Sequence, residues 1–95
     1  MRTIRYSNKA RKQLKRIPRH YQDAIFDTVD KLVTFPNCKG LDIRSLKQDK
    51  YGYRLRVGRC RVFFNDRETI RVIAVQEVKK RDERAYQTAG YSSGW

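Results

Sequence analysis

Three arginines have the spacing that brings guanidinium groups together on a β-hairpin. Arg54 and Arg56 alternate with apolar residues, the pair Gly58-Arg59 can form a two-residue loop, and Arg61 follows in the next strand candidate. A glycine at the first loop position suits a type II′ turn, and this register places all three arginines on one face of the sheet. Like charges that face each other destabilise a sheet, and a phosphate between them relieves the repulsion because guanidinium groups bind it bidentately. The pattern predicts a phosphate-binding face; the simpler alternative is three side chains that spread into water.

A second basic segment follows the last strand candidate and ends in a tyrosine. It contains Lys79, Lys80, Arg81, Arg84 and Tyr86. If the last strand lies beside the hairpin, this segment reaches the rim of the arginine cluster, where its cations could hold a phosphate and the tyrosine could stack on a base. Taken alone, the segment is equally compatible with an exposed, solvated end of the chain.

Other kinds of catalytic site find little support. The aspartates at positions 42, 49, 66 and 82 are too dispersed for a metal cage, there is no Gly-rich phosphate loop, and we expect neither a metal nor a cofactor. His20 is the single histidine, so one chain cannot provide a histidine pair, and we expect His20 to be a surface or helix-capping residue. Metal-independent attack of an RNA 2′-hydroxyl on its own phosphate remains, with arginines stabilising the developing charge. DNA lacks this nucleophile.

The overall charge also indicates a polyanionic partner. Lys and Arg number 23 against 10 Asp and Glu, which gives the chain of 95 residues a net charge of +13. Self-repulsion of this size costs stability, whereas binding to a phosphate backbone releases counterions and is favourable. No apolar run could span a bilayer and the first residues do not resemble a signal peptide, so we expect a cytoplasmic protein with no membrane partner. Its two cysteines, Cys38 and Cys60, should be reduced.

The N-terminal part of the chain has helical periodicity. We expect a short strand over Thr3–Tyr6 and then a helix over Lys9–Ile17, with a serine or asparagine cap before it. Pro18 ends this helix and can open the next, over Arg19–Thr34. The two helices would form an antiparallel hairpin, and the exposed face of the first is strongly basic.

From Leu41 onward the apolar residues alternate with a period of two. This alternation predicts strands over Leu41–Leu46, Tyr51–Val57, Cys60–Phe64 and Thr69–Val75. A turn is expected over residues 65–68, and a short helix or loop over Lys79–Tyr86. The residues on the side of the hairpin opposite the arginines would supply the core: Tyr53, Leu55, Val57, Val62 and Phe64.

The expected fold class is α+β. An N-terminal strand precedes a helical hairpin packed on a three- to four-stranded antiparallel sheet, followed by a short C-terminal helix or loop. Residues 1–86 would form a single domain and residues 87–95 a flexible C-terminal tail.

The hairpin and its surroundings resemble a known protein family. The stretches Tyr53-Arg54-Leu55-Arg56-Val57-Gly58 and Arg61-Val62-Phe63-Phe64, the following apolar strand, the basic cluster and Tyr86 are similar to the RelE/ParE toxin superfamily. The resemblance spans about Ile4 to Tyr86 and includes the helical hairpin. RelE-like members cleave mRNA in the ribosomal A site and pair with an antitoxin. ParE-like members share the fold but poison DNA gyrase and lack the catalytic basic set.

The resemblance implies catalytic roles for the hairpin arginines. Arg54 and Arg56 stand where well-known RelE-like toxins carry lysines. Because arginine stays protonated it is a poor general base, so Arg56 would orient the 2′-hydroxyl and stabilise charge, and the proton acceptor stays open. Arg61 would bind the scissile phosphate.

The resemblance assigns the remaining roles to the basic C-terminal segment and the first helix. Arg81 would stabilise the leaving 5′-oxygen, or Lys80 instead, because the spacing from Arg81 to Tyr86 is one residue shorter than the family pattern. Tyr86 would stack on or orient the cut nucleotide. Contacts with RNA or the ribosome are expected from Lys9, Arg11, Lys12, Lys15, Arg16, Lys79, Lys80 and Arg84.

The function implied is that of a type II toxin-antitoxin toxin, a ribosome-dependent, metal-independent mRNA endoribonuclease that inhibits translation. Its partners would be mRNA in the ribosomal A site, ribosomal RNA and a cognate antitoxin with an acidic segment or one that covers the arginines. Two alternatives stay open. One is a ParE-like toxin that inhibits DNA gyrase without nuclease activity, and the other is an RNA-binding module that does not cleave.

Overall fold

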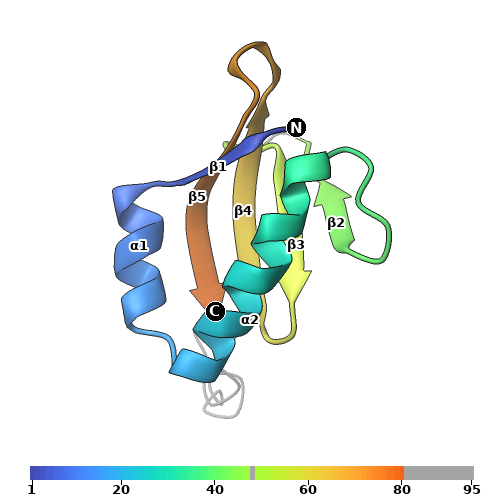
Figure 1. Ribbon diagram of the computed structural model, residues 1–95. Helices are drawn as coiled ribbons and strands as arrows, with labels where there is room; N and C mark the ends of the chain where they lie inside the picture. Colours follow the sequence, from blue (N-terminus) through green and yellow to red (C-terminus); the bar gives the residue numbers. More distant parts are fainter. Residues whose placement is uncertain (48, 81–95) are drawn as a thin grey trace.

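The computed structural model describes residues 1–47 and 49–80 and shows an α+β fold, with one five-stranded sheet and two helices (Figure 1). The elements are β1 (Thr3–Tyr6), α1 (Asn8–Lys15), α2 (Arg19–Asp30), a 3-10 turn (Lys31–Thr34), β2 (Asp42–Ser45), β3 (Tyr53–Val57), β4 (Cys60–Arg67), a second 3-10 turn (Glu68–Ile70) and β5 (Val72–Lys80). The predicted terminal helix or loop beyond Lys80 and the predicted tail lie outside the described residues, as do Arg81, Arg84 and Tyr86. Among the residues described, no helix is both long enough and apolar enough to cross a bilayer.

The helical hairpin is held by hydrogen bonds at both ends of α1. The hydroxyl of Ser7 accepts a backbone N–H of the first turn at 3.0 Å, as expected for an N-cap. Pro18 precedes α2, and the side-chain amide of Gln22 donates to the carbonyls of Leu14 and Ile17 at 2.7 and 2.8 Å. The Leu14 carbonyl also accepts the Ile17 N–H at 3.0 Å, so Gln22 adds a second bond to this carbonyl and one to the Ile17 carbonyl just beyond the end of α1. The predicted hairpin is confirmed, although the last predicted turn of α2 is a 3-10 turn.

The sheet has five strands and is mixed, because the predicted N-terminal strand joins the four that follow the helices. Its order is β1-β5-β4-β3-β2, with all neighbours antiparallel except β1, which pairs parallel with β5 through Thr3 opposite Val72 to Tyr6 opposite Val75. The predicted three- to four-stranded antiparallel sheet is therefore wrong in this detail. Parallel pairing requires a long crossover, here the whole chain from α1 to β4, and no local pattern reveals the partner of a four-residue strand.

The last two strands are displaced along the chain from their predicted positions. Residues 65–67, predicted as a turn, continue β4, and the reversal is the 3-10 turn over Glu68–Ile70. Strand β5 then extends to Lys80, so Lys79 and Lys80 lie in a strand and not in the predicted helix or loop. They pair with Arg61 and Cys60. A charged end is compatible with a strand because one sheet face is open to solvent, whereas the sequence pattern there suggests an exposed coil.

The core lies between α2 and one face of the sheet (Figure 1). Ile25 and Val29 of α2 are fully buried against a sheet face that includes Leu55, Val62 and Phe64, all fully buried. Of the predicted core residues, these three are confirmed as buried, and Tyr53 and Val57 pack partly buried at its margin. Burial of these side chains holds one face of the hairpin inward, and this leaves the alternate residues on the other face.

Helix α1 covers the edge of β5 where β1 ends, and in Figure 1 it runs alongside that strand. The side-chain carbonyl of Gln13 accepts the Val78 N–H at 2.6 Å, and the Ser7 hydroxyl donates to the Gln76 carbonyl at 2.8 Å. Two polar backbone groups of an otherwise open strand edge are thereby paired.

Candidate phosphate-binding face

On the sheet face that points away from α2, eight side chains form two adjacent rows across four strands. The pairings Asp42–Arg56, Arg56–Arg61 and Arg61–Lys79 form one row. The pairings Arg44–Arg54, Arg54–Phe63 and Phe63–Glu77 form the next. Paired residues share a face, and so do residues two apart in a strand. We call this set the arginine face: Asp42, Arg44, Arg54, Arg56, Arg61, Phe63, Glu77 and Lys79.

The predicted hairpin register is confirmed. Val57 pairs with Cys60 and Arg56 with Arg61. Gly58 has φ +56° and Arg59 is not among the residues with positive φ, the combination that a type II′ turn requires. Arg54, Arg56 and Arg61 therefore share one face of the sheet.

Two of the three arginines share a single carboxylate. Asp42 lies 3.6 Å from the guanidinium of Arg54 and 4.0 Å from that of Arg56, measured between the nearest nitrogen and oxygen atoms. The Asp42 side chain is 51% exposed, so the pairs are long, solvated and weak. The Arg54 side chain is 18% exposed, and its Nε is buried with no hydrogen-bond partner in the part of the chain that the structure describes. One solvated carboxylate leaves most of the positive charge of this cluster available to an anion.

The side chain of Arg61 makes no hydrogen bond or ion pair within the described part of the chain. Its side chain is exposed, with Arg56 on one side and Lys79 on the other. Three cations in a row across adjacent strands repel each other, and a phosphate at their centre removes that repulsion. On the arginine face, this row is therefore the position at which a bound phosphate would be stabilised most by the surrounding positive charge.

The two lysines at the end of β5 lie on opposite faces. Lys79 pairs with Arg61 and belongs to the arginine face. Lys80 pairs with Cys60, which is buried on the core side, and its ammonium lies 5.1 Å from the centre of the Tyr21 ring of α2. The structure therefore brings Lys79, and not Lys80, beside the arginines.

Glu77 is a buried carboxylate at the edge of the arginine face, with an exposed side-chain fraction of 7%. The Tyr51 hydroxyl donates to it at 2.7 Å and the Gln13 amide at 3.4 Å, while the ammonium groups of Lys9 and Lys79 lie 3.5 and 3.8 Å away. Burial alone would raise the pKa of Glu77, but the two hydrogen bonds and the two charges together lower it below its ordinary value. Glu77 is thus a fixed anion that joins α1, the β2–β3 loop and β5, and a poor proton acceptor.

An aromatic pair lies next to the arginines. The rings of Tyr51 and Phe63 are 5.6 Å apart between centres and inclined by 36°. Phe63 stands directly opposite Arg54 in the sheet. The hydrogen bond to Glu77 holds the Tyr51 hydroxyl and, with burial, raises the pKa of Tyr51 to about 12.

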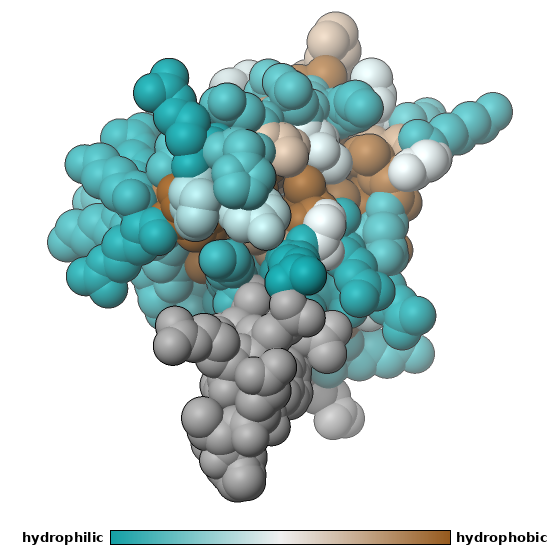
Figure 2. All heavy atoms as spheres, turned by 90° about the horizontal axis from the view of Figure 1, so that it is seen from below, coloured by the Kyte–Doolittle hydropathy of each residue, from teal (hydrophilic) through white to brown (hydrophobic). Residues whose placement is uncertain are grey.

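The predicted basic face of α1 is exposed. Lys9, Arg11, Lys12, Lys15 and Arg16 are all solvent-exposed, while Ala10 and Leu14 are buried beneath them. Figure 2, which views the molecule from below, shows long hydrophilic side chains on the α1 side at the left. Among the described residues, Lys9 links this group to the arginine face through an ion pair with Glu77.

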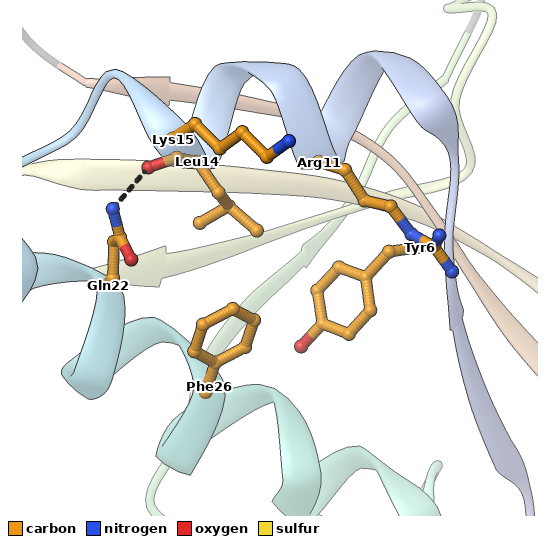
Figure 3. A pocket seen from close by; sticks show the side chains of 6 residues that line it. All are labelled: Tyr6, Arg11, Leu14, Lys15, Gln22 and Phe26. Carbon is orange, nitrogen blue, oxygen red and sulfur yellow. Dashed lines mark hydrogen bonds between the residues drawn. The ribbon is translucent and has the colours of Figure 1, made fainter.

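A mostly apolar pocket of about 270 Å³ lies between α1 and α2. Cationic side chains stand on its rim (Figure 3). It is lined by Tyr6, Arg11, Leu14, Lys15, Gln22 and Phe26. Burial, with a smaller contribution from the charge of Asp30, raises the pKa of Tyr6 to about 12, and the buried Tyr6 hydroxyl has no hydrogen-bond partner among the residues described. The pocket can take an apolar side chain flanked by a carboxylate.

Several residues of the arginine face were missed by sequence reasoning. The alternation of Asp42 and Arg44 with an apolar residue in β2 could be recognised in the sequence. The register of β2 on β3 could not be predicted, because the connection between these strands is not a two-residue turn. Glu77 and the Tyr51–Phe63 pair gave no signal, because their contacts join segments far apart in the chain.

No group of His, Cys, Asp or Glu side chains within residues 1–47 and 49–80 is arranged to hold a metal ion. His20 lies at the start of α2, exposed and 4.1 Å from the Tyr21 ring, remote from the arginine face. The candidate site in the described chain is therefore built of arginines, lysines, two carboxylates and two aromatic rings.

Comparison with known families matches residues 4–85 to the ParE toxin of the type II toxin-antitoxin system, parDE, and the chain belongs to this family. It is therefore a toxin of a type II toxin-antitoxin system. Comparison with curated protein sequences gives no match.

Solved structures show the same fold at low sequence identity. A chain of the archaeal RelE-RelB complex from Pyrococcus horikoshii OT3 is 21% identical, with a TM-score of 0.71, covering 86% of this chain and 97% of that chain. A chain of the RelBE2 toxin-antitoxin complex from Mycobacterium tuberculosis is 16% identical, with a TM-score of 0.71 and coverages of 84% and 98%. The isolated E. coli RelE toxin is 13% identical, with a TM-score of 0.70 and coverages of 94% and 96%.

Proposed function

We propose that this toxin is a ribosome-dependent, metal-independent endoribonuclease that cleaves mRNA in the ribosomal A site and so inhibits translation in the cytoplasm. The observation that carries the proposal is the row of Arg56, Arg61 and Lys79 on an open sheet face, in which the Arg61 side chain makes no hydrogen bond or ion pair within the described residues. Such a row suits a phosphate that gains negative charge during reaction.

The reaction is attack of the RNA 2′-oxygen on the adjacent phosphorus, which forms the O2′–P bond and breaks the P–O5′ bond. Arg61 binds the scissile phosphate, and Arg56 orients the 2′-hydroxyl and stabilises the developing charge. Arg54 supports Arg56 from the same strand. Arg81 and Tyr86, which lie outside the described residues, are proposed to stabilise the leaving 5′-oxygen and to stack on the cut nucleotide.

The exposed cations of α1 are proposed to contact ribosomal RNA, because they form a continuous basic surface that leaves the arginine face free for the message. The proposed antitoxin partner carries acidic side chains. An acidic segment could pair with the arginine face, and an apolar residue beside a carboxylate suits the pocket between α1 and α2.

Primer extension on mRNA translated by purified ribosomes, with and without this protein, tests the proposal and reports the cut position. We expect cleavage that survives EDTA added at a concentration the ribosomes tolerate. Arg61→Ala should reduce the cleavage rate by at least 100-fold, the usual scale for loss of an oxyanion-stabilising donor. Arg67→Ala, which removes the same charge at the far end of β4, is the control and should cleave normally. Normal cleavage by the Arg61 variant would refute the site assignment.

The second candidate is inhibition of DNA gyrase without nuclease activity, which the match to the ParE toxin family favours. A supercoiling assay with purified gyrase separates the two candidates. Inhibition of supercoiling together with intact mRNA on the ribosome would establish the ParE-like function and overturn the nuclease proposal.

A further inference from the structure

The aromatic pair beside the arginines, Tyr51 and Phe63, is only half-buried. The core aromatic residue Phe64, next in the chain, is by contrast fully buried. The pair lies on the open side of the sheet, among charged side chains and away from α2. Half-exposed aromatic rings among cations are the combination that single-stranded nucleic acid uses, since bases stack on the rings and phosphates pair with the charges.

The pair is held rigidly in place from several directions. The Tyr51 hydroxyl is anchored by the buried Glu77 at 2.7 Å. The Tyr51 N–H donates to Asp49 at 3.1 Å, and the next amide, of Gly52, donates to the Asn65 side chain at 2.5 Å. A platform that is already ordered loses little conformational entropy when a ligand stacks on it.

Positively charged side chains lie beside both rings of the pair, so that a base stacked there would have a cation near the phosphate on each side of it. The ammonium of Lys79 lies 5.6 Å from the centre of the Phe63 ring, and that of Lys50 lies 5.3 Å from the centre of the Tyr51 ring. The Lys79 side chain is 61% exposed, so its ammonium can leave the ring and follow a phosphate. Arg54 is directly opposite Phe63, and Arg61 is two residues before it in β4.

We propose that Tyr51 and Phe63 form a nucleobase-stacking subsite, which holds the base of a nucleotide whose phosphate lies on the row of Arg56, Arg61 and Lys79. The ligand is a single-stranded RNA segment, and this choice of ligand rests on the proposed function. Glu77 acts as a positioning residue, because it fixes the Tyr51 ring and does not touch the RNA. The subsite accepts any base, since every base has a π-face and no hydrogen-bonding group of the pair is directed at base edges.

The test measures binding of fully 2′-O-methylated RNA trimers, which lack the attacking hydroxyl and stay intact. One trimer carries adenine at its centre and the other is abasic there, with the same number of phosphates. Stacking of one base on an aromatic side chain contributes about 1–3 kcal/mol, so we expect the adenine trimer to bind roughly 5- to 150-fold more tightly. Fluorescence anisotropy of an end-labelled trimer gives both dissociation constants.

Variants of the full chain test which aromatic ring is responsible for the preference for the adenine trimer. Phe63→Leu should bring the affinity ratio of the two trimers to below about two, and Tyr51→Leu should lower it. Ile70→Ala, at an exposed apolar residue in the turn between β4 and β5, is the control and should leave the ratio unchanged. Tyr51→Phe keeps the ring but loses its anchor, so a partial loss of the ratio is expected. Circular dichroism confirms that each variant is folded under the conditions of binding.

The outcomes distinguish this inference from the proposed function. Equal affinity for the two trimers in the wild-type protein, or a ratio that Phe63→Leu leaves intact, overturns the stacking subsite even if mRNA is cleaved on ribosomes. A base-dependent ratio that disappears in Phe63→Leu supports it. If ribosomal cleavage is absent while that ratio holds, the nuclease proposal fails and the subsite stands as part of an RNA-binding surface.

Discussion

Replacing Tyr51 by phenylalanine removes one hydrogen bond from Glu77 and leaves the ring contact with Phe63 possible. The lost bond is short, at 2.7 Å, and its acceptor is a carboxylate whose side chain is 7% exposed, so water cannot easily take its place. Hydrogen bonds to charged groups contribute about 1.5–3 kcal/mol. Because Gln13, Lys9 and Lys79 still face the carboxylate, we expect the lower end of this range, about 1.5 kcal/mol. For a domain of this size the change corresponds to a decrease in Tm of roughly 6–12 °C.

The destabilisation should depend on pH in a defined direction. The folded protein lowers the pKa of Glu77, so the stabilisation from this carboxylate is fully present above its ordinary pKa of 4.5 and is lost as the pH falls through the lowered value. The difference between wild type and Tyr51→Phe should therefore shrink in acid. At high pH, the pKa of Tyr51 is raised from 10.0 to about 12, so the wild-type advantage is complete below pH 10 and declines as the pH rises through 12.

Urea unfolding followed by circular dichroism, at neutral pH and again below pH 4, measures both effects. Tyr53→Phe is the matched control, because the Tyr53 hydroxyl makes no hydrogen bond within the described residues, and it should change stability by less than about 0.5 kcal/mol. The reasoning is refuted if Tyr51→Phe is as stable as wild type at pH 7. It is also refuted if the difference between the two proteins widens on acidification.

Three further predictions concern the core, the cysteines and the charge of the arginine face. Leu55 is fully buried between the sheet and α2, so Leu55→Ala should lower the free energy of unfolding by about 2–5 kcal/mol. Urea titration measures this change, and a loss below about 1 kcal/mol would contradict the assigned core. Burial raises the pKa of Cys60, whereas Cys38 is half-exposed, so Ellman's reagent should label one thiol quickly in the folded protein and the second only in denaturant. Arg61→Ala should reduce the slope of log affinity against log salt concentration for single-stranded RNA by about 0.7, and an unchanged slope would show that Arg61 contacts no phosphate.

The arginine cluster could be predicted because its geometry is local. Arg56 and Arg61 are joined by a two-residue turn, and the alternation of apolar side chains decides which face is buried. A few neighbouring residues therefore determine both the register and the orientation of the hairpin. The buried Leu55, Val62 and Phe64 on the opposite face confirm this interpretation. The helical hairpin was predictable for a similar reason, since Pro18 and the apolar stripes of both helices are local features.

The surroundings of the cluster could not be predicted in the same way. Asp42 and Arg44 reach the arginine face through the pairing of β2 with β3, whose connection has no strong turn signal. The end of β5 looked like a charged coil because Lys79 and Lys80 lack an apolar pattern. In the fold, pairing with β4 keeps both lysines in a strand and places one on each face.

By itself, the sequence determined the hairpin, its three arginines, the basic face of α1 and the α+β class, because periodicity and turn chemistry act over a few residues. Only the tertiary structure decided that β1 pairs parallel with β5, that Gln13 closes the β5 edge, and that Glu77 holds Tyr51 beside Phe63. The contacts of Gln13 with β5 join residues 64 and 65 positions apart. Contacts at such separations form only when burial of the core brings the elements together, so no local pattern encodes them.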